Sequence, residues 1–284
     1  MNKISLSRKL NICGNQLGFT LIELFIGIVI SVIAITAGLK IFDHMQNSSV
    51  QQVEISMLQQ NQRGVLTILE RELRLIGMDM NQSNIFGITD VRKFTITNPG
   101  VDATPSAAGS PILRMTMDLN DDKSIGPGEI ITYALYDRDN DGQPPFELAR
   151  STATPVTDEI NGRQLLAEGI QAIGFAYAFD ADGDGIIDRQ VVVPGDPPSI
   201  IWAVDSNNDG LLDADLSGAA LPGGGTVPTS AIRAVQFWIL GMAQRQDSSY
   251  TNTNVYSVGD QPPFVPNDQF RRWLLTEIVH CRNL

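Results

Sequence analysis

Two short segments of this 284-residue chain place oxygen-bearing side chains at alternate positions ahead of a glycine. Counted from the first aspartate, the candidate ligands occupy positions one, three, five and nine, and Gly185 or Gly210 occupies position six. They are Asp180, Asp182, Asp184 and Asp188 in the first segment and Asp205, Asn207, Asp209 and Asp213 in the second. Alternate side chains on such a turn converge on one hard cation, and the glycine allows a sharp bend. The spacing therefore predicts two structural calcium sites.

Neither segment is a complete EF-hand loop, because position twelve holds Val191 or Leu216 in place of a bidentate glutamate. The closing ligand would have to come from elsewhere in the fold or from water. The alternative is a hairpin turn rich in Asp, Asn and Gly that binds no metal. Repetition of the pattern favours calcium, since an unneutralised cluster of carboxylates within one turn repels itself.

Two earlier segments are weaker metal candidates with the same pattern. The candidate ligands of the first are Asp118, Asn120, Asp122 and, at position twelve, Glu129. Lys123 stands there in place of the glycine. The candidate ligands of the second are Asp137, Asp139 and Asp141, followed by glycine and then by prolines where later ligands would stand.

A different chemistry is indicated near the N-terminus, where Glu23 lies inside a long apolar run. From Phe19 to Phe42 the only charged residues are Glu23 and Lys40. At ~1.5 Å per residue, a helix of this length crosses a bilayer core of about 30 Å. A carboxylate in hydrocarbon costs roughly 2.5 kcal/mol or more unless it is neutralised, so Glu23 is a candidate functional residue.

The six residues from Gly18 to Glu23, Gly-Phe-Thr-Leu-Ile-Glu, follow a short basic leader and open the apolar run. This arrangement resembles the class III signal peptide of type IV pilins and type II secretion pseudopilins. The resemblance implies that a prepilin peptidase cuts between Gly18 and Phe19 and methylates the new amino terminus. It also implies that Glu23 neutralises the terminal amine of a neighbouring subunit in a filament. The alternative is an ordinary signal anchor whose glutamate lies near the lipid headgroups.

The charge and the cysteine content of the chain limit its possible compartment and partners. The leader carries Lys3, Arg8 and Lys9, which predicts a single-pass inner-membrane protein with a cytoplasmic N-terminus and a periplasmic head. Its removal would take the formal net charge from −12 to −15, so nucleic-acid binding through a basic patch is not expected. Cys13 lies in the leader, so the processed chain would hold only Cys281 and form no internal disulfide.

These sites must be positioned by an α+β fold in four parts. We expect a leader over 1–18, a transmembrane helix over 19–42, an amphipathic continuation over 43–78 that ends near Gly77, and a β-rich head over 79–284. Short β-branched and aromatic runs separated by Gly, Pro, Asn and Asp predict a mostly antiparallel head. The predicted strands are 91–97, 112–117, 130–136, 146–150, 170–179, 189–193, 232–242 and 270–280.

Three later segments, 167–177, 232–240 and 271–284, are similar to PilW-type minor pilins. The resemblance implies the type IV pilin-like fold and a minor pilin of type IV pilus assembly, in a priming or tip complex on the cell surface. It implies other minor pilins, the major pilin and a large tip adhesin as partners. A type II secretion pseudopilin of the GspJ type, which shares the first two segments more loosely, is the alternative. A membrane-anchored calcium-binding module that never polymerises is a third hypothesis.

Catalysis is not expected from this sequence. The chain has two histidines, His44 and His280, and contains no G-x-S-x-G, H-E-x-x-H or Walker pattern. Cys281 lies at the last predicted strand, where a buried structural cysteine is the simpler interpretation. A carboxylate hydrolase would require two carboxyls ~5 to 9 Å apart in a pocket outside the calcium loops.

Overall fold

The computed structural model describes residues 19–79, 85–96, 104–152, 163–191 and 195–284. The predicted leader, 1–18, lies outside the described residues. The chain divides into two compact units, Met1–Gln51 and Gln52–Leu284. All of the described strands belong to the second unit.

A single long helix, α1 (Leu21–Leu73), contributes to both units. Its length and composition suffice to cross a membrane. Within the first unit, the apolar side chains of the predicted transmembrane stretch, 19–42, are all exposed. An apolar surface of this extent needs lipid or other protein surfaces to cover it.

Within the second unit, one stripe of α1 is buried against the sheet. Leu58, Val65, Leu69 and Leu73 recur at steps of seven and four residues and are almost completely buried. The helix ends at Leu73, and a turn leads to Gly77. Gly77 has φ +69°, a left-handed conformation that favours glycine and lies in the turn after the helix. The predicted helical continuation to residue 78 was therefore too long by about one turn, because α1 ends at Leu73.

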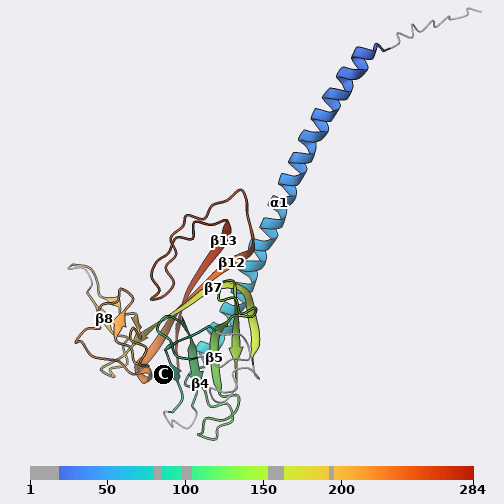
Figure 1. Cartoon of the computed structure of the whole chain (residues 1–284). Helices are drawn as coiled ribbons and strands as arrows, with labels where there is room; N and C mark the ends of the chain where they lie inside the picture. The colour runs from blue at the N-terminus through green and yellow to red at the C-terminus, as the bar shows by residue number, and fades with distance from the viewer. Residues whose placement is uncertain (1–18, 80–84, 97–103, 153–162, 192–194) are drawn as a thin grey trace, which may run out of the picture. The chain divides into compact units, whose positions relative to one another are not determined.

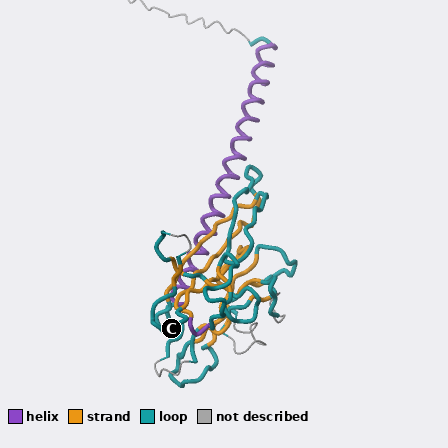
Figure 2. The backbone as a smooth tube through the Cα atoms, turned by 90° about the vertical axis from the view of Figure 1, so that its left-hand side faces the viewer, coloured by secondary structure: helices purple, strands orange, loops and turns teal. Residues whose placement is uncertain are grey.

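The second unit is built on a mostly antiparallel sheet, and long loops join its strands (Figures 1 and 2). The strands of the main sheet are β1 (Ile88–Asp90), β4 (Leu113–Thr116), β5 (Ile130–Tyr136), β6 (Phe146–Ser151), β7 (Gln164–Phe179), β10 (Ala203–Val204), β11 (Ala214–Asp215), β12 (Ile232–Gln246) and β13 (Phe270–His280). Two small sheets pair β2 (Lys93–Phe94) with β3 (Ser110–Pro111) and β8 (Arg189–Gln190) with β9 (Ser199–Ile200). A short 3-10 helix, η1 (Thr229–Ala231), precedes β12.

The long strand β7 is the centre of the main sheet. One of its edges pairs with β12, in a register that includes Ile173 opposite Ile239, and β12 in turn pairs with β13. The other edge pairs with β6 along the first part of the strand and with β10 at Tyr177. The remaining order runs from β6 through β5 and β4 to β1. The predicted α+β class, a long helix with a mostly antiparallel head, is confirmed.

The observed strand boundaries agree with the prediction where the local pattern is strong. β5 and β13 have the predicted bounds. β7 begins at Gln164 rather than at residue 170, because its first residues pair with β6 and Gly169, at φ +77°, lies where the register shifts. The prediction for 91–97 was too long, since among its described residues, 91–96, only Lys93–Phe94 forms a strand, β2. The short strands β1, β3, β9, β10 and β11 were not predicted, because two or three residues carry no clear alternation.

Two layers of packing fix α1 and the long strands. Between α1 and the sheet, α1 approaches β12 so closely at Gly241 that a Cβ there would lie 2.5 Å from Gln62 Nε2 and 2.7 Å from Leu58 Cδ1. On the other face, Tyr256 and Val258 from the connection between β12 and β13 pack on β12 and β7. The main sheet therefore has one cluster of buried residues on the face that packs on α1 and a second, separate cluster beneath this long connection.

The C-terminal residues close on the end of α1. Asn283 Nδ2 donates to the Arg74 carbonyl at 3.3 Å. The Leu284 side chain fills the space beside Gly77, where a Cβ would overlap Leu284 Cδ2. The last residues thus complete the surroundings of the turn that ends α1.

Candidate cation-binding loops and the N-terminal motif

Thr20 and Glu23 form a capping box at the start of α1. The Glu23 carboxylate accepts hydrogen bonds from the backbone amide and the hydroxyl of Thr20, both at 2.9 Å, and the Glu23 amide donates to that hydroxyl at 3.3 Å. This exchange satisfies amides that the first helical turn leaves without partners. Sequence analysis missed this local role, although the Thr-x-x-Glu spacing signals it. Phe19 is 90% exposed, and Gly18 lies outside the described residues.

The four acidic segments form four loops that begin one or two residues after the ends of β4, β5, β7 and β10. We name them by their first residues: the Asp118 loop (118–129), the Asp137 loop (137–145), the Asp180 loop (180–188) and the Asp205 loop (205–213). The aspartate at position one is buried in every loop, and the side chains at positions three and five are exposed. Each loop therefore has one anchored carboxylate and two side chains that face solvent.

In three loops the carboxylate at position one accepts hydrogen bonds from the amides at positions four and six. The donors are Asn140 (2.9 Å) and Gly142 (2.7 Å) to Asp137, Gly183 (2.7 Å) and Gly185 (2.9 Å) to Asp180, and Asn208 (2.6 Å) and Gly210 (2.7 Å) to Asp205. In the fourth loop only the position-four amide, that of Asp121, donates to Asp118, at 2.6 Å. The position-one carboxylate thus organises the turn in all four loops.

All four loops share one backbone conformation. Positions four and six have left-handed φ values, which are 62° at Asp121 and Lys123, 58° and 71° at Asn140 and Gly142, 74° and 83° at Gly183 and Gly185, and 67° and 91° at Asn208 and Gly210. The sequence ranks the Asp118 loop lower because Lys123 replaces glycine. The backbone nevertheless adopts the same turn there, so the ranking did not reflect the local geometry.

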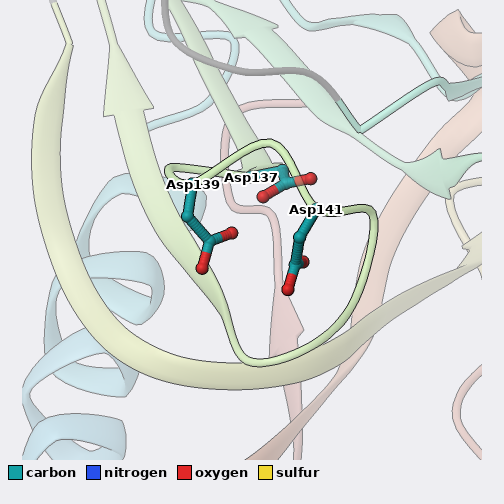
Figure 3. Close-up of side chains that lie close together, drawn as sticks. All are labelled: Asp137, Asp139 and Asp141. Carbon is teal, nitrogen blue, oxygen red and sulfur yellow. The ribbon is translucent and has the colours of Figure 1, made fainter.

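Carboxylate oxygens converge in two of the loops. One oxygen from each of Asp137, Asp139 and Asp141 lies within 4.8 Å of the others, and the same holds for positions one, three and five of the Asp180 loop, which are Asp180, Asp182 and Asp184. Figure 3 shows the first group gathered on one side of its turn. The carboxylates of the Asp137 loop, which the sequence ranks lower because of its prolines, therefore converge within the same 4.8 Å as those of the Asp180 loop.

In the Asp205 loop an amide stands at position three. Asn207 Nδ2 donates to Asp209 Oδ2 at 3.1 Å, so the side chains at positions three and five lie together. The Asp118 loop repeats this contact between Asn120 Nδ2 and Asp122 Oδ2 at 3.0 Å. Carboxylate and amide oxygens are the ligands that calcium prefers, and all four loops offer them at the same positions.

The predicted later ligands hold the backbone of their loops. Asp188 Oδ2 accepts the Ala181 amide at 3.1 Å, and Asp213 Oδ1 accepts the Ser206 amide at 2.8 Å. In the Asp118 loop this role falls to Glu129, whose Oε1 accepts the amides of Leu119 (2.9 Å) and Asn120 (3.3 Å) and whose Oε2 accepts that of Gly126 (2.7 Å). These carboxylates close their loops through backbone amides.

The electrostatics of the loops differ although their geometry is shared. The pKa of Asp139 is raised, first by its hydrogen bond with the Asp137 carboxyl and further by the charge of Asp141. Burial raises the pKa of Asp205. Burial acts in the same direction on Asp180, but the amides of its turn and the Arg233 guanidinium outweigh it and lower the pKa of this carboxyl. A bound cation would neutralise carboxylates that repel one another, as Asp139 and its neighbours do.

The Asp205 loop is joined to a distant strand. Asn208, at position four, accepts the Lys93 amide at 2.6 Å and donates to the Lys93 carbonyl at 3.3 Å. The Lys93 ammonium forms an ion pair with Asp260. The loop is thereby connected to β2 and to the connection between β12 and β13, which sequence spacing could not reveal.

Cys281 and its neighbour His280 lie at the C-terminal end of β13. Cys281 follows β13 and is buried, and burial raises the pKa of its thiol to about 12. A thiol with this pKa is protonated at neutral pH and is a poor nucleophile. His280, its neighbour, is exposed.

The chain combines an apolar N-terminal helix with an antiparallel head, which is the arrangement that its resemblance to pilins implies. The family model described as Type IV Pilus-assembly protein W matches residues 136–283, which is more than half of the chain. The chain belongs to this family, PilW, and is a pilin related to type IV pili. Membership in a pilus-assembly family implies other pilins as partners.

The chain is also similar to a solved pilin structure. A type IV-like pilin from Thermus thermophilus is similar in structure, with 16% sequence identity, a TM-score of 0.38, and coverage of 82% of this chain and 97% of that one. No curated protein matches the sequence significantly. The PilW match includes the Asp137, Asp180 and Asp205 loops and begins after the Asp118 loop.

Proposed function

We propose that this protein is a minor pilin that acts in a priming or tip complex of type IV pilus assembly. The observation that carries the proposal is the PilW family match, together with an exposed apolar helix that begins beside Phe19. The precursor would insert in the inner membrane with its N-terminus in the cytoplasm and its head in the periplasm. It would then join a filament with other minor pilins and the major pilin, near a large tip adhesin.

Processing would convert the N-terminal motif into an assembly contact. A prepilin peptidase would cut between Gly18 and Phe19 and methylate the new amine. Glu23 would then meet the amine of a neighbouring subunit, which removes the cost of a lone carboxylate in hydrocarbon. The capping box supports this role, because it holds the Glu23 carboxylate on Thr20 at the first turn of α1.

The test separates the capping role of Glu23 from its charge. A strain that lacks the gene is complemented with wild type, Glu23→Gln or Glu23→Ala, and surface pili and secreted proteins are counted together. Glutamine also serves in a capping box but carries no charge. We expect both variants to fail to restore pili, while Glu23→Gln keeps the protein folded and membrane-bound.

Two outcomes contradict the proposal. Full piliation with Glu23→Gln would show that capping, not charge pairing, is what assembly requires. Normal pili in the deletion strain, with a loss of secreted proteins, would assign the protein to a type II secretion filament instead. Mass spectrometry of the membrane-extracted protein tests processing directly, because the mature chain would begin at a methylated Phe19.

We also propose that calcium is a structural ion of the head, bound at the Asp180 and Asp205 loops and, in a weaker form, at the Asp137 loop. The support is the shared turn, which places oxygens at positions one, three and five. Neutralisation of crowded carboxylates such as Asp139 would contribute favourable free energy to calcium binding. The ion would fix the loops that leave β5, β7 and β10, with no role in a reaction.

A further inference from the structure

The Asp118 loop contains a buried carboxylate oxygen with no partner. Asp118 is 3% exposed, and its Oδ1 accepts the Asp121 amide at 2.6 Å. No hydrogen-bond donor in the described part of the chain reaches its Oδ2, which is shielded from solvent. Since Oδ1 is bonded within the turn, the carboxylate faces the loop.

The other three loops show what Oδ2 lacks. In each of them the second oxygen of the position-one aspartate accepts the amide at position six, at 2.7 to 2.9 Å. Lys123 holds position six of the Asp118 loop with the same left-handed φ, yet Oδ2 has no such bond. A buried carboxylate oxygen without a donor is unfavourable, and a cation beside it would remove that cost.

The Asp118 loop carries oxygen-bearing side chains at the positions where the other loops carry theirs. Asn120 and Asp122, at positions three and five, are joined at 3.0 Å. Glu129, which is 2% exposed, holds the amides of positions two and three and so keeps the loop closed. Within the described residues, no lysine or arginine forms an ion pair with Asp118, Asp122 or Glu129.

We propose that the Asp118 loop binds one divalent cation, calcium by its oxygen-only ligands, through Asp118 Oδ2 and the side chains of Asn120 and Asp122. Glu129 acts as a positioning residue. Calcium accepts six to eight oxygens, and water fills the remaining positions. One of the two loops that the sequence ranks lower thus has a ligand atom left without a protein partner in the described part of the chain. This inference does not depend on the pilus role or on calcium at the other loops.

The position of this loop gives the ion a structural consequence. The Asp118 amide donates to the Met78 carbonyl at 2.8 Å, and the Gly77 amide donates to the Thr116 carbonyl at 3.3 Å. Both bonds join the end of β4 to the segment that follows α1. A cation on Asp118 would therefore fix the point where the chain leaves α1 for the sheet.

The test uses the full-length protein in detergent and compares Asp118→Asn with Asp137→Asn. The asparagine at 118 keeps an acceptor for the Asp121 amide and removes only the charge, so no hydrogen bond is lost. The asparagine at 137 loses one of two acceptors. In excess chelator we expect D118N to melt no lower than wild type and D137N to melt lower.

Bound calcium is then counted by equilibrium dialysis with radioactive calcium. We expect D118N to bind one ion fewer per chain than wild type and to show a smaller rise in Tm when calcium is added. Asp122→Asn, at an exposed position, is the second variant and should lose the same ion while it folds normally. Equal numbers of bound ions in wild type, D118N and D122N would overturn the proposal, as would a wild-type protein that binds no calcium.

Discussion

Gly241→Ala should loosen the contact between α1 and β12. The new Cβ would lie 2.5 Å from Gln62 Nε2 and 2.7 Å from Leu58 Cδ1, about 1 Å closer than an ordinary contact. Overpacking of this kind costs about 1–3 kcal/mol. The Gln62 amide is not free to yield, because its Nε2 donates to the carbonyls of Ile239 (3.3 Å) and Trp273 (3.0 Å). Loss of these bonds adds about 1 kcal/mol or more, for a total of about 2–4 kcal/mol.

The assay is thermal unfolding of the full chain in detergent. At about 2–4 °C per kcal/mol for a domain of this size, we expect Tm to fall by roughly 5–15 °C. Gly64→Ala is the matched control, since Gly64 lies on the same helix and a Cβ added there would have no atom within 4 Å. It should stabilise the helix by about 0.5–1 kcal/mol. An unchanged Tm in G241A would refute the close approach of α1 to β12.

Two further predictions concern the ions and pH. Excess chelator should lower the Tm of the wild-type protein by several degrees, and added calcium should restore it. Unchanged melting together with no calcium in elemental analysis would contradict the proposed calcium sites. Burial alone would raise the pKa of Asp90, but hydrogen bonds from Arg92 and the charges of Arg92 and Arg114 outweigh it and lower this pKa. The stability that Asp90 contributes is therefore present above its unfolded pKa of about 3.9 and is lost as pH falls through the folded value. Asp90→Asn should lower stability at pH 7 and flatten its dependence on pH below about 4, as measured by denaturant unfolding; an unchanged acid limb would contradict this.

Local patterns predicted the elements that are long or strongly periodic. The apolar run and the stripe from Leu58 to Leu73 define α1, and the β-branched runs of β5 and β13 define their bounds. The alternate aspartates located all four acidic loops. These features depend on neighbours within a few residues of one another, which is the range that sequence reasoning resolves.

Contacts between distant segments could not be predicted in the same way. Glu72 on α1 accepts hydrogen bonds from Arg150 Nε at 2.8 and 3.0 Å and from the Tyr133 hydroxyl, residues 78 and 61 positions away. Nothing in the spacing pairs them. The ranking of the acidic loops was limited for a related reason, because the left-handed conformation of Lys123 is imposed by the turn and not by the residue type.

The contact of Leu284 with Gly77 delays the completion of the fold during synthesis. During synthesis at about 5–20 residues per second, the ~200 residues between them take roughly 10–40 s to emerge. Until β13 and Leu284 arrive, the stripe on α1 lacks part of its cover and the end of the helix is not held. Over that interval, aggregation through the exposed apolar stripe of α1 competes with folding of the head. This competition ends only when β13 and Leu284 have been synthesised.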